Sequence, residues 1–338
     1  MRAQGITYDT GWIRNGTTSI PHLDPERVAH DLQIIRDELH CNTVRLTGGH
    51  PDRLDVAAGL AVGLGLEVWY SPYPLDLTTD EMLTLFDDCA ERAEKLRQAG
   101  GEIVFVAGAE LSLFAHGFLP GDTFADRIEP LVNRSPEMPA LIAESSKRLD
   151  AFFATAVPRI RERFGGRVTY ASIQLDRLDW TPFDIVSIDL YRTAAIADQF
   201  VDGVRAYVAM DKPLAITEFG CATFAGASDR GAEGLEIVEN DPETGKPLRL
   251  DGEYTRDEAG QADTIRDLLE IFDAEGVDSA FVFLFALADH PHRPDGDPRD
   301  DLDLASYGIV RVLDDGSWEP KEAFAAIAEF YGSRTPSR

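Results

Sequence analysis

Two glutamates, Glu110 and Glu218, stand at the ends of short apolar segments. The first follows the run 103–109 and the second follows the run 213–217, and both runs are rich in β-branched and other apolar residues. Such runs are typical of parallel strands that are covered on both faces. A carboxylate at the end of a buried strand has no role in packing. Two of them are what glycosidic bond cleavage requires, one as acid and one as base or nucleophile.

The segments around these glutamates alternate between strand patterns and helix patterns. Strands are expected at 5–9, 42–46, 66–71, 103–109, 168–173, 185–190, 213–217 and 280–287. Helices are expected at 25–40, 51–64, 79–98, 139–164, 198–209, 257–275 and 320–332. Eight alternations without a strong linker favour α/β architecture as a single (β/α)8 TIM barrel over 1–338, rather than a doubly wound sheet.

Two long loops follow the glutamate-bearing strands. They cover about 117–139 after strand four and 221–254 after strand seven, and the second contains a hairpin-like piece at 238–250. The carboxyl ends of barrel strands form the mouth where active sites are found, so these loops are expected to lie over the mouth.

The charge of the chain excludes some classes of partner. Lys and Arg number 32 and Asp and Glu number 60, which gives a formal net charge of −28. Phosphate backbones and anionic membrane surfaces attract basic faces, so neither nucleic acid nor a membrane is expected as a partner. The three cysteines, Cys41, Cys89 and Cys221, argue against a disulfide framework and for a reducing compartment. With no apolar leader at the start, we expect a cytoplasmic protein, and the oligomeric state stays open.

Several motifs occur in the order found in one superfamily. The strand-four sequence Gly108-Ala109-Glu110-Leu111 and the strand-seven sequence Thr217-Glu218-Phe219-Gly220 resemble the clan A retaining glycoside hydrolases. The first is similar to the Gly-x-Glu-Leu of β-mannanase-like barrels. Three further segments that fit this clan are 42–46, 184–191 and 307–310, with Gln261-Ala262 in the helix before the last strand.

This resemblance implies a role for each glutamate. In the clan, the acid/base follows strand four and the nucleophile follows strand seven, which correspond here to Glu110 and Glu218. The chain departs from the clan at two places: Ala109 stands where most members have Asn, and Phe285-Ala286-Leu287 stands where most have Trp on strand eight. The departures bear on substrate identity more than on the acid/base role.

Residues near the other strand ends are candidates for binding substrate. Arg45 can orient the Glu218 carboxylate, or it can be an interior ion pair of the barrel. Tyr191 can donate to the nucleophile or line the mouth as a packing aromatic. Asp189 can be an inward ion-pair partner or a sugar ligand, and we favour the ion pair. The remaining candidate substrate ligands are Trp12, Trp69, Gln174, His116 and His290.

An aspartate-rich stretch at 289–303 contains His290 and His292. It lacks the regular ligand spacing of calcium loops, so we interpret it as a solvated acidic loop and expect no metal. Glycine-rich phosphate-binding fingerprints are missing after the expected strands, and no cofactor is expected.

The leading hypothesis is a retaining glycoside hydrolase that acts on a small soluble glycoside or glycosylated metabolite. Two alternatives use the same barrel: a non-catalytic carbohydrate-binding or partner-binding protein, and a transglycosylase or sugar-rearranging enzyme. The separation of the Glu110 and Glu218 carboxyl groups distinguishes retention from inversion, at about 5–5.5 Å against about 6.5–9.5 Å.

Overall fold

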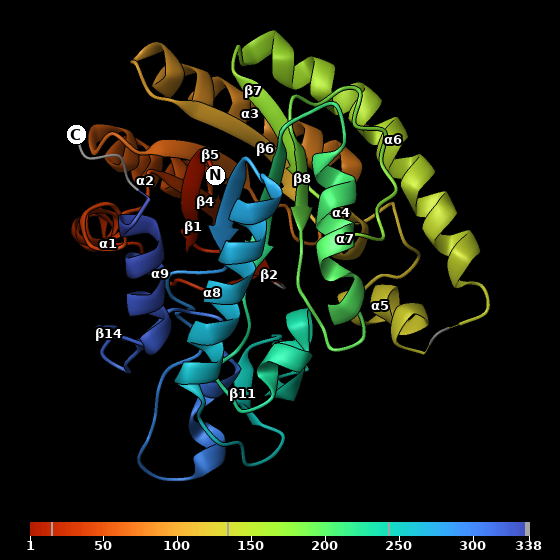
Figure 1. Ribbon diagram of the computed structural model, residues 1–338. Helices are drawn as coiled ribbons and strands as arrows, with labels where there is room; N and C mark the ends of the chain where they lie inside the picture. The colour runs from red at the N-terminus through yellow and green to blue at the C-terminus, as the bar shows by residue number, and fades with distance from the viewer. Residues whose placement is uncertain (15, 134, 243, 335–338) are drawn as a thin grey trace.

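The computed structural model describes residues 1–14, 16–133, 135–242 and 244–334, and eight parallel strands form its centre (Figure 1). These strands are β1 (Ala3–Asp9), β4 (Thr43–Gly48), β5 (Glu67–Pro72), β6 (Ile103–Ala109), β7 (Arg167–Ala171), β8 (Val186–Asp189), β9 (Leu214–Phe219) and β12 (Ser279–Val282). Their order in the sheet is β7-β6-β5-β4-β1-β12-β9-β8. Just beyond β7, Ser172 pairs with Ile188, and the Asp189 amide donates to the Ser172 carbonyl at 2.7 Å. The sheet therefore closes into a barrel, as the alternating patterns predict.

Helices surround the strands in Figure 1. They are α1 (Pro25–Asp37), α2 (Pro51–Gly63), α3 (Thr79–Gln98), α6 (Met138–Arg163), α7 (Ala197–Val208), α8 (Glu258–Glu275) and α9 (Glu322–Gly332). No helix was expected between the fifth and sixth strands, and residues 172–185 connect β7 to β8 without one, so the count of eight strand–helix alternations is one too many. In this stretch Trp180 packs against Phe183, and Phe183 packs against Phe153 of α6, so side chains cover the barrel where a helix would otherwise lie.

The sequence signals for helix starts agree with the structure. Asp24 precedes α1 and its side chain accepts a hydrogen bond from the Glu26 amide, with Pro25 in the first turn. Thr78 and Glu81 form a capping box at the start of α3. These caps fix where the connections from the barrel mouth enter the helices.

The connections at the carboxyl ends contain more structure than expected. The region after β6, interpreted as a loop, contains the short helices α4 (Leu111–Phe114) and α5 (Phe124–Val132). The hairpin expected at 238–250 is present as β10 (Val238–Asn240) and β11 (Pro247–Leu250). A second hairpin, β2 (Ile13–Arg14) with β3 (Thr17–Thr18), was not predicted.

The last barrel strand is shorter than the predicted range 280–287. β12 ends at Val282, although the amides of Phe283 and Phe285 still donate to the carbonyls of Phe219 and Thr7, at 2.9 Å each. The carbonyls of Leu284 and Phe285 accept hydrogen bonds from the amides of Ile309 and Val310, so they are not available to a neighbouring barrel strand.

The barrel interior is filled by side chains at its amino end. Trp69 and Phe281 lie 4.7 Å apart between ring centroids, and both are fully buried among small and β-branched residues. This packing makes the lower barrel a solid core, so any chemistry must take place above it, at the carboxyl ends of the strands.

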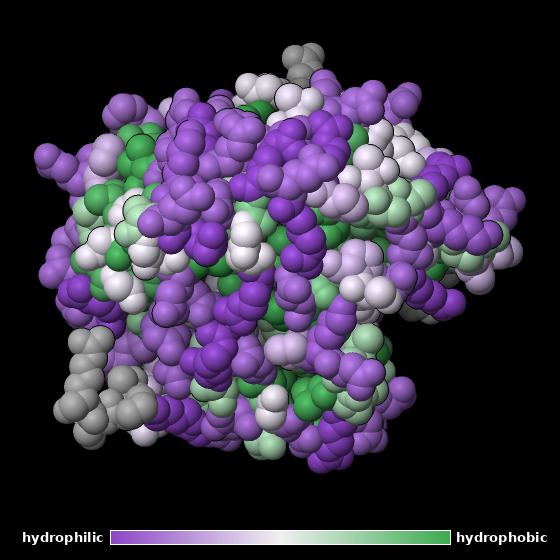
Figure 2. Space-filling model, turned by 90° about the horizontal axis from the view of Figure 1, so that it is seen from above, coloured by the Kyte–Doolittle hydropathy of each residue, from purple (hydrophilic) through white to green (hydrophobic). Residues whose placement is uncertain are grey.

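The outer surface is mostly polar. Figure 2 shows one face of the molecule, largely hydrophilic, with apolar side chains scattered rather than gathered. Within the part of the chain that the structure describes, no helix combines the length and apolar character needed to cross a membrane.

Candidate active site

Glu110 lies directly after β6, at a turn that points its side chain into the barrel mouth. Its backbone is in the left-handed region, with φ 47° and ψ 39°, which is uncommon for a residue other than glycine. The Glu110 amide donates to the Ala171 carbonyl at 2.9 Å, and the next amide, of Leu111, donates to the Tyr170 hydroxyl at 2.8 Å. Unusual backbone conformations held in this way concentrate at functional sites.

Glu218 lies near the end of β9 and is held by two side chains. The Arg45 guanidinium, which is completely buried, donates from Nη1 to Glu218 Oε1 at 2.7 Å. The Tyr191 hydroxyl donates to Glu218 Oε2 at 3.2 Å. Each carboxylate oxygen therefore has a donor of its own, which fixes the orientation of the carboxylate.

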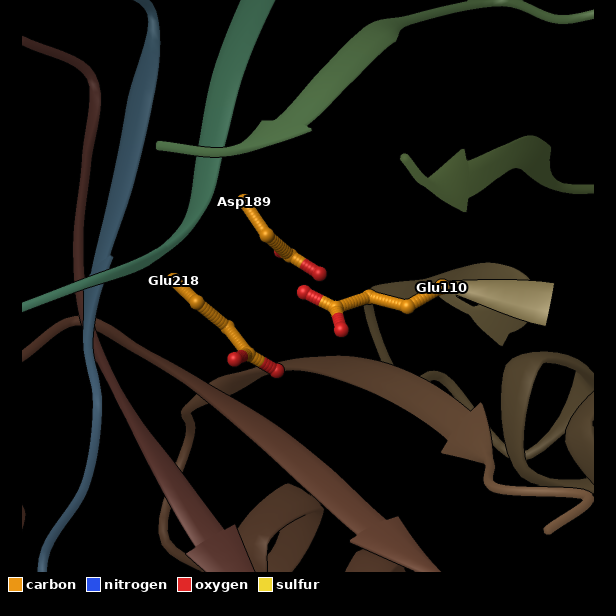
Figure 3. Close-up of side chains that lie close together, drawn as sticks. All are labelled: Glu110, Asp189 and Glu218. Atoms are coloured by element: carbon orange, nitrogen blue, oxygen red, sulfur yellow. The ribbon is translucent and has the colours of Figure 1, made fainter. Parts of the chain in front are cut away.

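A third carboxyl group, that of Asp189, completes a cluster with these two glutamates. Figure 3 shows the three side chains converging from three different barrel strands or their ends. One oxygen of each carboxyl group lies within 4.8 Å of an oxygen of each of the others. Asp189 and Glu218 are buried, whereas Glu110 is half-buried.

The surroundings change the acidity of two of these groups. Burial, followed by the charges of Asp189 and Glu218, raises the pKa of Glu110 well above its usual range. Burial and the charge of Glu218 raise the pKa of Asp189, against the opposing effect of Arg45. Glu110 is therefore suited to hold a proton near neutral pH, which is what a general acid needs.

A cavity of about 560 Å³ opens over the cluster. Glu110 and Glu218 both line it, together with aromatic side chains that can cover the apolar faces of a ligand. The ring planes of Trp12 and Phe283 are nearly parallel, with centroids 6.0 Å apart, and Tyr73 meets Trp12 edge-on. Aromatic walls around a carboxylate pair fit a sugar, which has apolar faces and polar edges.

The structure brings together five of the predicted site residues in this cavity: Glu110, Glu218, Tyr191, Trp12 and His290. Arg45 lies beneath the cavity, against Glu218. His290 is oriented by a hydrogen bond between its Nδ1 and Asp289 Oδ1 at 2.7 Å.

Three of the predicted substrate ligands lie elsewhere. Trp69 is fully buried in the lower barrel, where its Nε1 donates to Glu67 Oε1 at 2.8 Å, so it cannot reach a substrate. Gln174 is exposed outside the cavity, on the connection between β7 and β8. His116 lies over α5, with its Nδ1 3.5 Å from the Arg127 guanidinium. None of these three residues lines the cavity that contains Glu110 and Glu218.

Three cavity or cluster residues were not predicted as functional. Tyr73 lies four residues after Trp69, and Phe283 lies two residues after the interior Phe281, so strand alternation points to both. For Asp189 an ion pair was preferred over a sugar ligand, and it does pair with Arg45 at 4.0 Å, but its carboxyl group also belongs to the carboxylate cluster.

The aspartate-rich stretch 289–303 also differs from the expectation of a solvated loop. Asp301 and Asp303 are buried and form ion pairs with Arg256, and Asp303 also pairs with Lys321. Asp301 and Asp303 therefore hold the loop in place, whereas Asp295, Asp297 and Asp300 are exposed, as expected of a solvated loop.

The carboxylate cluster offers oxygen ligands that hard cations prefer. The guanidinium of Arg45 lies 2.7 Å from Glu218 and 4.0 Å from Asp189, so a positive charge is already present among these oxygens. The donor set is thus better suited to proton chemistry than to a divalent cation.

Comparison with known proteins gives no match among family models and none among curated sequences. Solved structures do match. Two structures of a GH113 β-1,4-mannanase are 17% and 18% identical, with TM-scores of 0.62 and 0.63, and each comparison covers 99% of this chain and 100% of the other. The GH113 β-mannanase AaManA from Alicyclobacillus acidocaldarius is 15% identical over 98% of this chain and 97% of its own, with a TM-score of 0.59. The chain therefore has the (β/α)8-barrel fold of these β-mannanases.

Proposed function

We propose that this protein is a retaining glycoside hydrolase, with Glu218 as nucleophile and Glu110 as acid/base. One observation carries the proposal: the two carboxyl groups line one cavity and bring an oxygen of each within 4.8 Å. This separation fits the distance of about 5–5.5 Å used for double displacement better than the roughly 6.5–9.5 Å that inversion needs for an intervening water.

In the first step Glu218 attacks the anomeric carbon, and the bond from that carbon to the leaving oxygen breaks. Glu110 transfers its proton to the leaving oxygen in the same step. Arg45 and Tyr191 hold the Glu218 carboxylate in place, one on each oxygen, so that the attacking atom does not have to be positioned at the moment of reaction.

In the second step Glu110, now a carboxylate, takes a proton from water. The water oxygen attacks the anomeric carbon, the bond to Glu218 breaks, and the sugar leaves with its original anomeric configuration. Glu110 thus regains its proton and Glu218 its charge, which restores the starting state. An acceptor alcohol in place of water would give transfer in place of hydrolysis.

The substrate class follows from the cavity and the comparisons. A space of about 560 Å³ with Trp12, Tyr73 and Phe283 in its walls fits a short glycoside rather than a long segment of polymer. The GH113 proteins of the same fold are β-1,4-mannanases. We infer that short β-mannosides are the first substrates to try.

Trapping of the nucleophile tests this function. Activated 2-deoxy-2-fluoro glycosides, beginning with the manno and gluco forms, are incubated with the protein, and the intact mass is measured. The proposal expects a mass increase of one fluorosugar, and a peptide map that places it on Glu218. Sugar binding in calorimetry with neither adduct nor product would reject the hydrolase and favour a carbohydrate-binding barrel.

A further inference from the structure

The carboxylate cluster carries more negative charge than its neighbours can neutralise. If Glu110, Asp189 and Glu218 were all ionised, the cluster would hold three negative charges. In the described part of the chain, Arg45 is the cation whose ion pairs reach these carboxylates. One positive charge against three negative ones leaves an excess of two in a largely buried site.

Arg45 is engaged mostly by Glu218. Its Nη1 donates to Glu218 Oε1 at 2.7 Å and to the Thr217 carbonyl at 3.0 Å, whereas Asp189 Oδ1 is 4.0 Å away. Neither carboxyl oxygen of Asp189 has a hydrogen-bond partner among the described residues, and its side chain is completely buried. The charge of Asp189 is thus only partly compensated.

The titratable groups on the neighbouring elements add to the excess negative charge of the cluster or leave it unchanged. Glu218 on β9, Glu110 after β6 and Asp176 after β7 are acidic, and each opposes a negative charge on Asp189 or Glu110. The hydroxyls of Tyr73 and Tyr191 stay neutral because burial raises their pKa values. Two carboxyl groups this close and this buried do not both ionise near neutral pH.

We propose that Asp189 and Glu110 together hold one proton in the resting protein, that this proton resides on Glu110, and that Asp189 is the positioning residue that keeps it there. The transfer of this proton to a leaving group rests on the proposed function, whereas its presence on Glu110 does not. Asp189 is the ionised member because the Arg45 guanidinium, 4.0 Å away, opposes the burial that raises the pKa of Asp189. The negative charge of Asp189 in turn opposes ionisation of Glu110.

This arrangement keeps the charge of the site constant during the first step. Before the reaction Glu218, Asp189 and Arg45 are charged and Glu110 is neutral, for a net charge of −1. When Glu218 becomes an ester of the sugar it loses its charge, and Glu110 becomes a carboxylate as its proton moves to the leaving oxygen. Arg45 is then left facing Asp189, and the net charge is still −1.

The test removes the negative charge of Asp189 and keeps a side chain of nearly the same shape. Asp189→Asn is compared with Asp211→Asn, which removes an exposed carboxylate in the turn before β9. Carboxyl groups are titrated by ¹³C NMR of protein labelled at Glu and Asp, with Glu110→Gln used to assign the Glu110 signal. We expect Asp189→Asn to lower the titration midpoint of Glu110 by about one pH unit or more, and Asp211→Asn to leave it in place.

The reciprocal variant keeps the test valid if Asp189→Asn folds poorly. In Glu110→Gln the midpoint of Asp189 should stay in place, because Gln is neutral like the protonated Glu110 beside which Asp189 titrates. An unchanged Glu110 midpoint in folded Asp189→Asn overturns the inference, and so does an Asp189 midpoint that falls in Glu110→Gln, since the proton would then rest on Asp189. So does binding of Mg²⁺ or Ca²⁺ that lowers both midpoints in the unaltered protein, since a cation would then take the place of the proton.

Activity separates this inference from the proposed function. If a glycoside is hydrolysed, the alkaline limb of its kcat/KM profile should move to lower pH in Asp189→Asn by the same interval as the NMR midpoint. If no glycoside is hydrolysed but the Glu110 midpoint shifts in Asp189→Asn, the placement of the proton on Glu110 stands and the glycosidase proposal fails.

Discussion

Arg45 and Glu218 join across the barrel interior, with Arg45 Nη1 2.7 Å from Glu218 Oε1 and the guanidinium fully buried. They belong to β4 and β9, which are separated in the sheet by β1 and β12. The contact therefore links opposite parts of the barrel mouth. It also fixes the orientation of Glu218, the proposed nucleophile, and it places a positive charge beside the carboxylate cluster.

The first prediction concerns this ion pair and stability. Arg45→Met removes the cation and leaves Glu218 and Asp189 buried without it, and breaking a buried pair from one side typically costs about 3–5 kcal/mol. We expect a loss of this size in the free energy of unfolding, measured by urea denaturation at pH 7. Arg45→Lys keeps the charge and should lose less; equal losses would contradict an electrostatic role.

The proposed nucleophile gives the second prediction. Glu218→Ala should lower kcat on a cognate glycoside by a factor on the order of 10⁴ or more, because the covalent intermediate can no longer form. Glu270→Ala, at an exposed position of α8 outside the cavity, is the matched control and should keep kcat within a few-fold. Turnover by Glu218→Ala near the unaltered rate would show that the nucleophile lies elsewhere.

The hydroxyl of Tyr191 is the basis of the third prediction. Tyr191→Phe removes the donor at 3.2 Å from Glu218 Oε2 and keeps the ring. A hydrogen bond to a charged group is worth about 1.5–3 kcal/mol, so kcat/KM should fall by roughly 10- to 100-fold with little change in unfolding. Tyr254→Phe, whose hydroxyl contacts Asp251 outside the cavity, should have no such effect on steady-state kinetics.

The barrel could be predicted because its strands are covered on both faces. The segment 103–109 is apolar along its whole length and coincides with β6, and the glutamates that end the apolar runs lie together at the mouth. An apolar run of this type indicates a parallel strand by itself, since burial on two faces leaves few alternatives.

The position of a side chain along the barrel axis could not be predicted in the same way. Trp69 and Tyr73 have the same inward direction on β5 and the residue that follows it, but four residues of strand separate them by roughly 13 Å. Only the position of the strand end relative to the barrel floor decides that Tyr73 lines the cavity and Trp69 the core. The short strand patterns do not define that end.

The place of Asp189 depends on a local irregularity. The register between β8 and β9 shifts between Ile188 and Asp189, which sets Asp189 opposite Glu218. A bulge of this kind redirects side chains near the end of a strand, and the pattern of the flanking residues does not predict it. The carboxylate cluster therefore needed the three-dimensional structure.

Trp12 supports a fourth prediction, on substrate binding. Its ring is stacked on Phe283 in the cavity wall, and its Nε1 donates to Thr47 Oγ1 at 3.1 Å. Trp12→Ala should raise KM roughly tenfold with a smaller change in kcat, because an aromatic wall for the sugar is lost. Trp180→Phe, a buried site away from the cavity, should leave KM unchanged; a similar rise in both would mean that the effect comes from general destabilisation.

The last prediction concerns stability and pH at Asp9, which is buried at the end of β1 and accepts hydrogen bonds from the Gly11 amide and the Ser19 hydroxyl. Burial raises the pKa of Asp9 from 3.8 to about 7. The folded protein therefore binds a proton there that the unfolded chain has already lost, so this group makes stability fall as pH rises from about 4 to about 7. The loss is on the order of 4 kcal/mol, at about 1.36 kcal/mol per unit of pKa shift.

Asp9→Asn should remove this dependence, since an amide has no charge to bury. Urea denaturation between pH 4 and 8 is expected to show a flatter stability profile for Asp9→Asn, and a higher free energy of unfolding than the unaltered protein at pH 8. Asp24→Asn, at the exposed start of α1, keeps a good helix N-cap and should leave the slope of the curve as it is in the unaltered protein. If the two variants keep the same slope as the unaltered protein, Asp9 is ionised in the folded state across this range, and its two donors compensate fully for its burial.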